Sequence, residues 1–458
     1  MVCVDSMNKM RKEESDMEDS IYSKIGKVHN SFGIFQLKSV LIKNDAGDWG
    51  TEPNENAVGI IRSTNFNNNG KLDLSDIAYR TLSPQKLEDK RLSSSDILIE
   101  RSGGSDTQPV GRVGYITDDM TNKNLAFANF IQRISLDETV DAKFVYYCLQ
   151  QMYEMGITAS MQFQTTGIRN LDWKFYLKSN LPKPAKEEQT AIANILSKVD
   201  EAIESFQNSI TATERLKKSL MQNLLTGRMK PDGTFRTSEE FYINEKFSKV
   251  PIGWEVKRVD ALFDFYPTAS YSRSMLSDNG DCKYIHYGDI HTRFDTFLDI
   301  SKETLPYINK DMVKKFVYLE NGDIIISDTS EDYEGVGKLV ETVNLGNSKV
   351  ISGLHTLLLR PKKNELINGF KGYLFNEERV RLEFLKYVTG IKVYSISKNS
   401  LAKVLLPIPT RQEQESIKDR LDTVNNDISS SRTKIMSLER LKKSLMQNLL
   451  TGKVIIDN

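Results

Sequence analysis

Cysteine and histidine are scarce in this chain, and their scarcity excludes several kinds of site. The 458 residues include three cysteines and four histidines, namely Cys3, Cys148, Cys282, His29, His286, His291 and His355. The cysteines lie far apart and no histidine stands at a ligand spacing from them, which supports neither a disulfide framework nor a zinc module. We therefore expect reduced, structural thiols and no metal centre.

Long apolar segments are also missing. No window holds 18 consecutive apolar residues, and residues 1–22 are polar and charged where a signal peptide would carry its apolar region. These features predict a cytoplasmic protein that begins with a disordered or weakly helical tail.

An excess of one charge is absent too, because 62 basic residues balance 62 acidic ones. This balance excludes a surface coated in positive charge. A nucleic-acid-binding protein, however, needs basic residues only where phosphates lie. Binding to DNA would therefore require the basic residues to gather on one side.

The common catalytic motifs are absent from the sequence. There is no GxxxxGK[ST], HExxH or GxSxG, and the stretch from Gly335 to Lys338 lacks the spacing that cradles phosphates. Acidic neighbours such as Glu187 and Glu188 fit the first turn of a helix better than a metal site, because negative charge there complements the helix dipole. We therefore expect no catalysis and no cofactor bound by this chain.

The most informative feature of the chain is an internal repeat. The sequence ERLKKSLMQNLLTG occurs at 214–227 and again at 439–452, and an offset of 225 aligns 181–227 with 406–452 at 25 identical positions out of 47. Each copy begins with LPxP and continues with a Glu-Gln pair before an apolar periodic stretch. The chain is therefore a tandem duplication.

Apolar residues recur in alternating steps of four and three along both copies, which predicts two long helices with a coiled-coil seam. The predicted seam residues are Ile192, Leu196, Val199, Ile203, Phe206, Ile210, Ile417, Leu421, Val424, Ile428, Ile435 and Leu438. Further along, the apolar stripe is expected to shift by three residues to Leu216, Leu220 and Leu224, with Leu441, Leu445 and Leu449 as their counterparts. Each helix should contain about 40 residues and extend roughly 60 Å.

The segments before the two helices show short β-type runs broken by Gly, Asn, Ser and Asp, which predicts strand-rich mixed α/β domains. We also expect helices at 142–155 and 369–384. The predicted α+β chain consists of a tail at 1–22, a first globular domain at 23–180, a first spacer helix at 181–227, a connector at 228–248, a second globular domain at 249–405, a second spacer helix at 406–452 and a C-terminal tail at 453–458. The parallel between DILI at 96–99 and DIII at 323–326 indicates that the two domains share a fold.

Taken together, the paired LPxP helices with their RLKKSLMQNLLTG endings, the GWEVKR stretch at 253–258, and the motifs DILIERSGGS at 96–105 and DIIISDTSED at 323–332 resemble a specificity subunit of a type I restriction-modification enzyme. The resemblance covers residues 25–452. It implies two target recognition domains, each of which reads one half of an asymmetric bipartite DNA site. It also implies antiparallel helices that set the gap and dock two methyltransferase subunits. Restriction subunits complete the assembly, with S-adenosylmethionine, ATP and Mg²⁺ bound by the partners.

Base and phosphate contacts call for Arg, Lys, Asn, Gln or hydroxyl side chains on loops over a rigid scaffold. In the first domain the candidate DNA-binding residues are Arg62, Asn65, Asn67, Arg101, Ser102, Ser105, Gln108, Arg112, Thr165, Thr166 and Arg169. In the second domain they are Arg273, Tyr287, Thr329, Ser330, Lys338, His355, Lys392 and Tyr394. Each has a structural alternative: a Gly-Ser loop can be a plain turn, and His355 can be a satisfied core histidine.

Two other functions fit parts of the pattern. One is a coiled-coil adaptor whose globular ends bind proteins, and the other is a self-contained nuclease or methylase. The adaptor would bind no DNA, whereas the nuclease or methylase would be active without other subunits.

Overall fold

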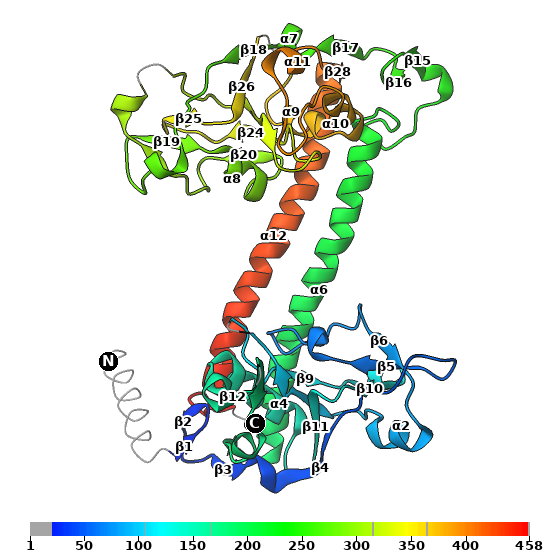
Figure 1. Cartoon of the computed structure of the whole chain (residues 1–458), viewed down its shortest axis with the longest axis vertical. Coiled ribbons are helices and arrows are strands. Elements are labelled where there is room, and N and C mark those ends of the chain that lie inside the picture. Colours follow the sequence, from blue (N-terminus) through cyan, green and yellow to red (C-terminus); the bar gives the residue numbers. More distant parts are fainter. Residues whose placement is uncertain (1–20, 106, 166, 314–315, 363–364, 457–458) are drawn as a thin grey trace, which may run out of the picture. The chain divides into compact units, whose positions relative to one another are not determined.

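The computed structural model describes residues 21–105, 107–165, 167–313, 316–362 and 365–456 (Figure 1). The tail expected at 1–22 therefore lies almost entirely outside the described residues. The chain divides into two compact units: unit 1 comprises residues 1–207 and 433–458, and unit 2 comprises residues 208–432.

Two helices of 39 residues each, α6 (Lys186–Leu224) and α12 (Arg411–Leu449), contribute to both units. Acidic residues in their first turns complement the helix dipole, and Gly227 and Gly452 follow their ends with φ of 69° and 71°. The two long helices expected from the repeat are thus present, each roughly 58 Å long at 1.5 Å per residue.

Within each unit the two helices lie side by side and run in opposite directions (Figure 1). In unit 1 the Lys442 ammonium lies 2.7 Å from the Asp200 carboxylate, and the Lys434 ammonium lies 5.2 Å from the centre of the Phe206 ring. In unit 2 the Arg432 guanidinium lies 2.8 Å from Glu214. In unit 1, where two such contacts are seen, the residue number rises on α6 as it falls on α12, which defines an antiparallel pair.

The residues of the predicted seam are buried to different degrees along the two helices. Its buried members are Ile192, Leu196, Val199, Ile203, Ile417, Leu421, Val424 and Ile428. Its half-buried members are Phe206, Ile210, Ile435 and Leu438. The deeply buried members near the helix starts belong to the cores of the globular domains, as Ile192 and Leu196 do in unit 1, and not to a helix contact alone.

The predicted shift of the apolar stripe is wrong. Leu216 and Leu441 are 51% and 47% exposed, while Lys217 is half-buried and Lys442 is buried at the position where the unshifted rhythm falls. The charge is tolerated there because the Lys442 ammonium pairs with Asp200 and lies 5.6 Å from the centre of the Tyr147 ring. The heptad therefore continues without interruption, with a lysine in the seam.

The globular domain of unit 1 contains, among other sheets, a four-stranded sheet and a three-stranded sheet with one parallel strand pair. The four-stranded sheet runs in the order β4 (Leu41–Ala46), β11 (Ile131–Leu136), β7 (Ile97–Glu100), β9 (Val113–Tyr115). The three-stranded sheet runs in the order β10 (Leu125–Phe127), β5 (Val58–Ile61), β6 (Ala78–Arg80). The remaining elements are β1 (Ile21–Ser23), β2 (Gly26–Val28), β3 (Gly33–Gln36), η1 (Leu37–Val40), η2 (Ser63–Asn65), α2 (Pro84–Lys90), β8 (Ser102–Gly103), α3 (Asp118–Thr121), α4 (Ala142–Glu154), η3 (Ile157–Met161), β12 (Gln162–Thr165), β13 (Ile168–Leu171), α5 (Trp173–Tyr176) and β14 (Asn180–Lys183).

In unit 2 the larger sheet has five strands, in the order β18 (Phe263–Tyr266), β26 (Thr356–Pro361), β22 (Ile324–Ser327), β24 (Leu339–Val343), β20 (Phe297–Asp299). The smaller sheet runs in the order β21 (Tyr307–Ile308), β19 (Cys282–Ile285), β25 (Val350–Ser352). The remaining elements are η4 (Ser238–Glu240), β15 (Phe241–Asn244), β16 (Ser248–Pro251), β17 (Glu255–Arg258), α7 (Val259–Leu262), η5 (Arg273–Met275), α8 (Tyr287–Thr292), η6 (Lys310–Met312), β23 (Thr329–Ser330), α9 (Lys371–Phe375), α10 (Glu378–Leu385), β27 (Tyr394–Ser395), α11 (Lys398–Leu401) and β28 (Leu405–Ile408).

The two domains share the order of their common strands, as the faint sequence parallel predicted, although the larger sheet of unit 2 has a fifth strand, β20, which is parallel to β24. Strands β7 and β22 hold the same place in the larger sheets, and each smaller sheet contains one parallel pair, β5 with β10 and β19 with β25. Both central strands are buried on two faces, because alternate residues point to opposite sides. Ile97 and Ile99 join the core that contains α4, while Leu98 joins a second cluster.

The helix expected at 142–155 is present as α4, but the one expected at 369–384 is two helices, α9 and α10. The break occurs at Glu377, whose buried carboxylate accepts a hydrogen bond from the Val380 amide and caps α10. The described part of the chain contains no helix long and apolar enough to cross a membrane.

Candidate nucleic-acid interface

In unit 1, three loop segments meet beside the residues that follow β7. The Arg112 guanidinium donates to the Glu100 carboxylate at 2.7 and 2.8 Å and to the Ser63 carbonyl oxygen at 2.9 Å, which ties the segment after β5 to β7. Strand β13 pairs with β8, and the Ser102 hydroxyl donates to Asn170 at 2.7 Å. The three segments predicted separately from the sequence therefore form one surface.

Two residues predicted to bind DNA at this surface are instead buried and hold neighbouring segments together. Arg112 is 6% exposed and Asn65 is 2% exposed. The guanidinium of Arg112 is occupied by Glu100 and backbone carbonyls, and the Asn65 amide donates to the Asp73 carbonyl oxygen at 2.7 Å. The base-contact role predicted for Arg112 and Asn65 is therefore wrong, because a buried, satisfied polar group is not available to a ligand.

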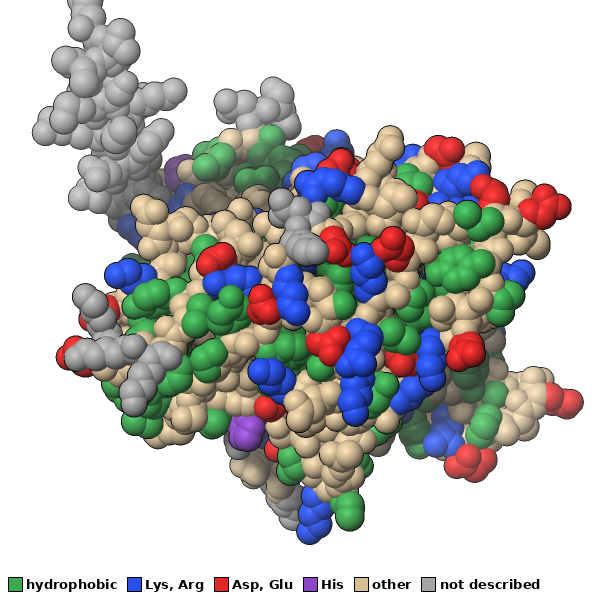
Figure 2. Space-filling model, turned by 90° about the horizontal axis from the view of Figure 1, so that it is seen from above, with side chains coloured by type: hydrophobic (Ala, Val, Ile, Leu, Met, Phe, Trp, Pro, Cys, Tyr) green, Lys and Arg blue, Asp and Glu red, His purple; other side chains and the backbone are tan. Residues whose placement is uncertain are grey.

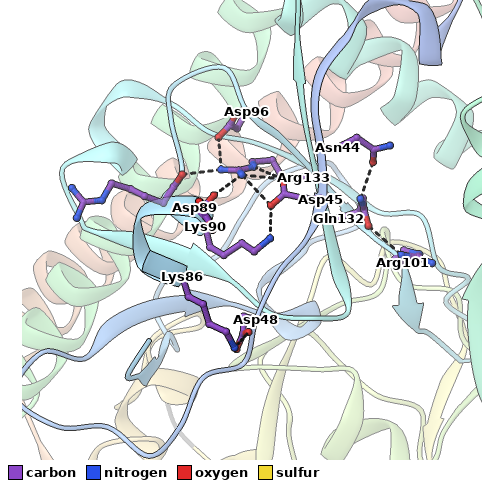
Figure 3. A network of polar contacts seen from close by, with 11 residues as sticks. Asn44, Asp45, Asp48, Lys86, Asp89, Lys90, Asp96, Arg101, Gln132 and Arg133 are labelled. Carbon is purple, nitrogen blue, oxygen red and sulfur yellow. Dashed lines mark hydrogen bonds and ion pairs between the residues drawn. The ribbon is translucent and has the colours of Figure 1, made fainter. Parts of the chain in front are cut away.

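Arg101 is held at the edge of this surface by a polar network along β11 (Figure 3). The Gln132 side chain donates to Asn44 at 2.8 Å and accepts from the Arg101 guanidinium at 3.2 Å. On the next residue of the strand, the Arg133 guanidinium binds the Asp45 carboxylate at 2.9 Å. Neighbouring side chains of a strand point to opposite faces. Gln132 therefore positions Arg101 on one face, while Arg133 holds β4 in place on the other.

The remaining candidates of unit 1 lie on loops and on the strands β12 and β13. Asn67 and Ser105 are exposed, Arg62 pairs with Asp76 at 2.8 Å, and Arg169 is half-buried opposite Gly103. Gln108 donates to the Asn68 amide oxygen at 2.8 Å, so Asn68 belongs to the surface although it was missed from the sequence. Thr166 and the side chain of Thr165 lie outside the described part of the chain.

In unit 2, predicted residues from four separate segments gather around the ring of Tyr287. The ring centre of His355 lies 5.3 Å from that of Tyr287, and the Thr329 hydroxyl lies 3.4 Å from His355 Nδ1. Arg273 pairs with Asp289 of α8 at 2.8 Å. The structure therefore brings Arg273, Tyr287, Thr329 and His355 into one cluster.

His355 is not the core histidine that the sequence left open. Its side chain is 48% exposed, and its backbone has φ of 55°, a left-handed conformation that a histidine seldom adopts. The Asp328 amide donates to its carbonyl oxygen at 3.1 Å, which holds the turn between β25 and β26. Strain of this kind persists where the surroundings enforce it and is frequent at binding sites.

Two further histidines belong to this cluster and were missed from the sequence. His291 Nε2 lies 2.8 Å from the Ser327 hydroxyl, and His286 Nδ1 accepts from the Gly288 amide at 3.1 Å as the cap of α8. Burial lowers the pKa of His286, and the positive charge of Arg273 lowers it further. His286 directly precedes Tyr287, and His291 follows Tyr287 by four residues, about one helical turn. This spacing is the signal that could have found them.

Two other predicted residues of unit 2 support the loops. The Lys338 ammonium donates to the His291 carbonyl oxygen at 3.0 Å, and Ser330 is 7% exposed. The direct DNA contact predicted for Ser330 is wrong because this residue is buried. Lys338 follows Gly337 as Arg112 follows Gly111, and both glycine amides donate to the last residue of the central strand. Lys392 is exposed, and the ring of Tyr394 lies 5.5 Å from that of Tyr333.

Positive and negative side chains are mixed on one face of the molecule. On the face shown in Figure 2, lysine and arginine side chains lie among aspartate and glutamate side chains. That face lacks the continuous positive charge that a run of phosphates attracts.

Nothing in the described residues resembles a metal centre, since they contain no group of three or more His, Cys, Asp and Glu that could hold an ion. The two described cysteines, Cys148 and Cys282, are free and buried, and burial raises the pKa of the Cys282 thiol to about 11. Thiols of this kind are unreactive.

The duplicated fold presents two different sets of guanidinium, amide, hydroxyl and imidazole groups, which is typical of a protein with two recognition surfaces. Comparison with known families identifies the class of protein. The family described as "Type I restriction modification DNA specificity domain" matches residues 32–214 and 251–440, one match in each half of the duplication. The chain therefore belongs to the family of type I restriction-modification specificity subunits, which are the DNA-recognition components and not the catalytic ones.

Individual relatives agree with this assignment. The chain is 25% identical over 343 residues to the type I restriction enzyme MjaVIII specificity subunit of Methanocaldococcus jannaschii, covering 73% of this chain and 76% of that protein. Its fold is similar to the crystal structure of an S subunit from M. genitalium, with a TM-score of 0.53, 15% identity, and coverage of 96% and 100%. A chain from a structure on complex assembly and conformational transition of the type I R-M system gives a TM-score of 0.51 at 15% identity, covering 93% of this chain and all of that one.

Proposed function

We propose that the two units read the two halves of an asymmetric bipartite DNA target. The observation that carries this proposal is one topology with two different sets of loop residues. Unit 1 offers Arg101, Asn67 and Gln108, whereas unit 2 offers an imidazole and phenol cluster around Tyr287. Guanidinium and amide groups pair with guanine and adenine edges, and a different set of groups selects different bases.

The paired helices act as the spacer between the two half-sites. Each helix is 39 residues long, and their contact is antiparallel within each unit. Rigid helices fix a distance, and a fixed distance between two reading surfaces translates into a fixed number of unread base pairs.

The repeated helix ends dock two methyltransferase subunits. Part of their identity is explained by packing, because Leu224 and Leu449 are buried in the two domain cores. Packing does not explain why Leu216 and Leu441 are identical while 51% and 47% exposed. Two copies of one exposed face suit two copies of one partner.

The chemistry takes place on the partners. The methyltransferase subunits bind S-adenosylmethionine, and restriction subunits bind ATP and Mg²⁺, while this chain binds no cofactor. Its role is to choose the DNA on which those subunits act.

The proposal is tested by DNA retention. The purified chain, alone or with its methyltransferase partners, should retain a duplex with the bipartite site in preference to a scrambled duplex. Its affinity should fall as salt rises, because phosphate contacts release counterions. Absence of salt-dependent retention with partners present would contradict DNA reading and favour a protein-binding adaptor.

A further inference from the structure

A short hairpin in unit 2 exposes aliphatic side chains beside the cluster around Tyr287. The chain turns back between Thr389 and Ser395, whose backbones exchange two hydrogen bonds of 2.9 and 2.8 Å. At the tip, Ile391 is 91% exposed and Val393 is 53% exposed, and Lys392 between them is exposed as well. Single exposed apolar residues are common on proteins, so exposure alone indicates nothing.

The hairpin is held tightly, which distinguishes it from an ordinary exposed loop. Gly390 has φ of 130°, and a Cβ at this position would lie 2.1 Å from the Val393 carbonyl oxygen, so only glycine closes the turn. Its outgoing strand β27 pairs with β23, and the Ile396 amide donates to the Asp328 carbonyl oxygen at 2.9 Å. Ile391 is therefore presented from a fixed position next to the candidate interface.

Unit 1 carries the same feature at the corresponding place. Its hairpin β12–β13 pairs with β8, the counterpart of β23, and its turn contains Gly167 with φ of 86°. Ile168 follows this glycine, is 42% exposed, and precedes Arg169, as Ile391 precedes Lys392. The surrounding polar loops have diverged between the two units, whereas the sequence glycine, exposed isoleucine, cation has been retained.

We propose that Ile391 is a wedge that enters a stacked base step of the duplex, while Lys392 binds the adjacent phosphate. Aliphatic side chains that insert between base pairs unstack them partially and bend the DNA, and a neighbouring cation fixes the position of the wedge on the backbone. This inference rests on the DNA recognition proposed above. It adds a contact that senses how easily one base step opens, which is independent of base-edge hydrogen bonding.

The test compares affinities of the full chain, assembled with its methyltransferase partners, for a matched duplex and for duplexes with one mismatch at each step of the site. The variants are Ile391→Ala, Ile391→Leu, Lys392→Ala and, as a matched control, Ile252→Ala, which truncates an isoleucine that is 65% exposed elsewhere in unit 2. Native mass spectrometry counts the subunits in each complex.

On the matched duplex, Ile391→Ala should bind about tenfold more weakly than the unmodified chain, since three methyl and methylene groups no longer occupy the step. At one mismatch position the two proteins should bind equally, because that step is already open. Ile391→Leu and Ile252→Ala should behave as the unmodified chain, whereas Lys392→Ala should lose affinity on every duplex and lower the salt slope by about one.

The wedge is overturned if Ile391→Ala binds the matched duplex normally, if its loss is the same on every mismatched duplex, or if it loses a methyltransferase subunit. Failure of the proposed function itself looks different: the unmodified assembly would then show no preference for its site over scrambled DNA.

Discussion

Lys371 and Glu341 form an ion pair in the core of unit 2. Both side chains are completely buried, their charged atoms lie 2.9 Å apart, and the Glu341 carboxylate also accepts from the amides of Gly369 and Gly372. Burial lowers the pKa of Lys371, and the carboxylate opposes that effect. The stability of the core therefore depends on both partners, since removal of one leaves the charge of the other buried and unpaired.

Lys371→Met should lower the free energy of unfolding of unit 2 by about 3–5 kcal/mol, because Glu341 keeps its charge without its counter-ion. Denaturant titration of the full chain measures this change. The control is Lys302→Met, whose side chain is 79% exposed and whose loss should change stability by no more than about 0.5 kcal/mol. Equal effects of the two substitutions would contradict the role given to the buried pair.

A second residue-scale prediction concerns pH. The pKa of His286 is lowered in the folded protein by burial, so the unfolded chain takes up a proton first as pH falls. The free energy of unfolding of unit 2 should therefore decrease as pH falls from 7.5 through the ordinary histidine pKa of about 6.5. The decrease should be complete once pH lies below the pKa of His286 in the folded protein.

His286→Asn keeps a side chain that can cap α8 but removes the titration. Melting temperatures measured between pH 7.5 and 5.5 should then depend less on pH in this variant than in the unmodified chain. An identical pH dependence in the two proteins would show that His286 does not cause the acid sensitivity.

At the scale of the elements, the helices were predictable and the direction of their side chains was less so. The 4–3 rhythm, the preceding prolines and the following glycines located both helices to within a few residues, because these signals are local. The predicted shift of the apolar stripe was wrong because a leucine, Leu216, is a usual seam residue and a lysine, Lys217, is not. The partners that allow a lysine in the seam, Asp200 and Tyr147 for Lys442, lie far away in the sequence.

At the candidate interface, too, the local features could be predicted and the direction of several side chains could not. Glycine and polar clusters located the loops, and several predicted residues of unit 2 do meet at Tyr287. The sequence did not reveal that Arg112 and Asn65 point inward, because their partners Glu100 and Asp73 become neighbours only in the folded domain. The sequence did not reveal that His286 lies close to His355, because the two residues are 69 positions apart.

Lengthening the spacer should change the gap and leave the half-sites unchanged. Four residues inserted into both helices, between Asn208 and Ser209 and between Thr433 and Lys434, add about one turn or 6 Å, equivalent to about one to two base pairs. The seam is only half-buried there, so the insertion is tolerated. The same insertion between Ala193 and Asn194 should prevent folding of unit 1, because Ile192 and Leu196 lie in its core.

Mapping of methylated sites in cells that carry the lengthened chain measures this outcome. Altered letters in either half-site with an unaltered gap would show that the helices do not act as a spacer.

Substitutions on the exposed face of the repeated helix ends should remove methyltransferase subunits one at a time. Leu216→Glu alone or Leu441→Glu alone should leave one such subunit per chain, and the double variant none, because each places a charge on one copy of the proposed dock. Native mass spectrometry gives the stoichiometry. Met436→Glu is the control, since Met436 is 51% exposed on the same helix but lies outside the identical stretch 439–452; loss of a subunit in this variant would contradict the location of the dock.

At the scale of the whole molecule, the duplication predicts that the reading domains are interchangeable. The core of unit 1 includes Leu449 and Leu450, and that of unit 2 includes their identical counterparts Leu224 and Leu225. A copy of residues 250–405 placed at 25–180 therefore meets the same helix surface. The methylated target should then contain the same word in both halves on opposite strands, and retention of the original first half would contradict domain-wise reading.

The central claim, that two related units read two separate words of DNA, is tested most directly by sequencing the methylated bases in a cell that carries this chain and its methyltransferase partners. The account predicts one asymmetric motif made of two unlike half-sites separated by a constant number of unspecified base pairs. A single continuous motif, or two half-sites with a variable gap, would contradict it.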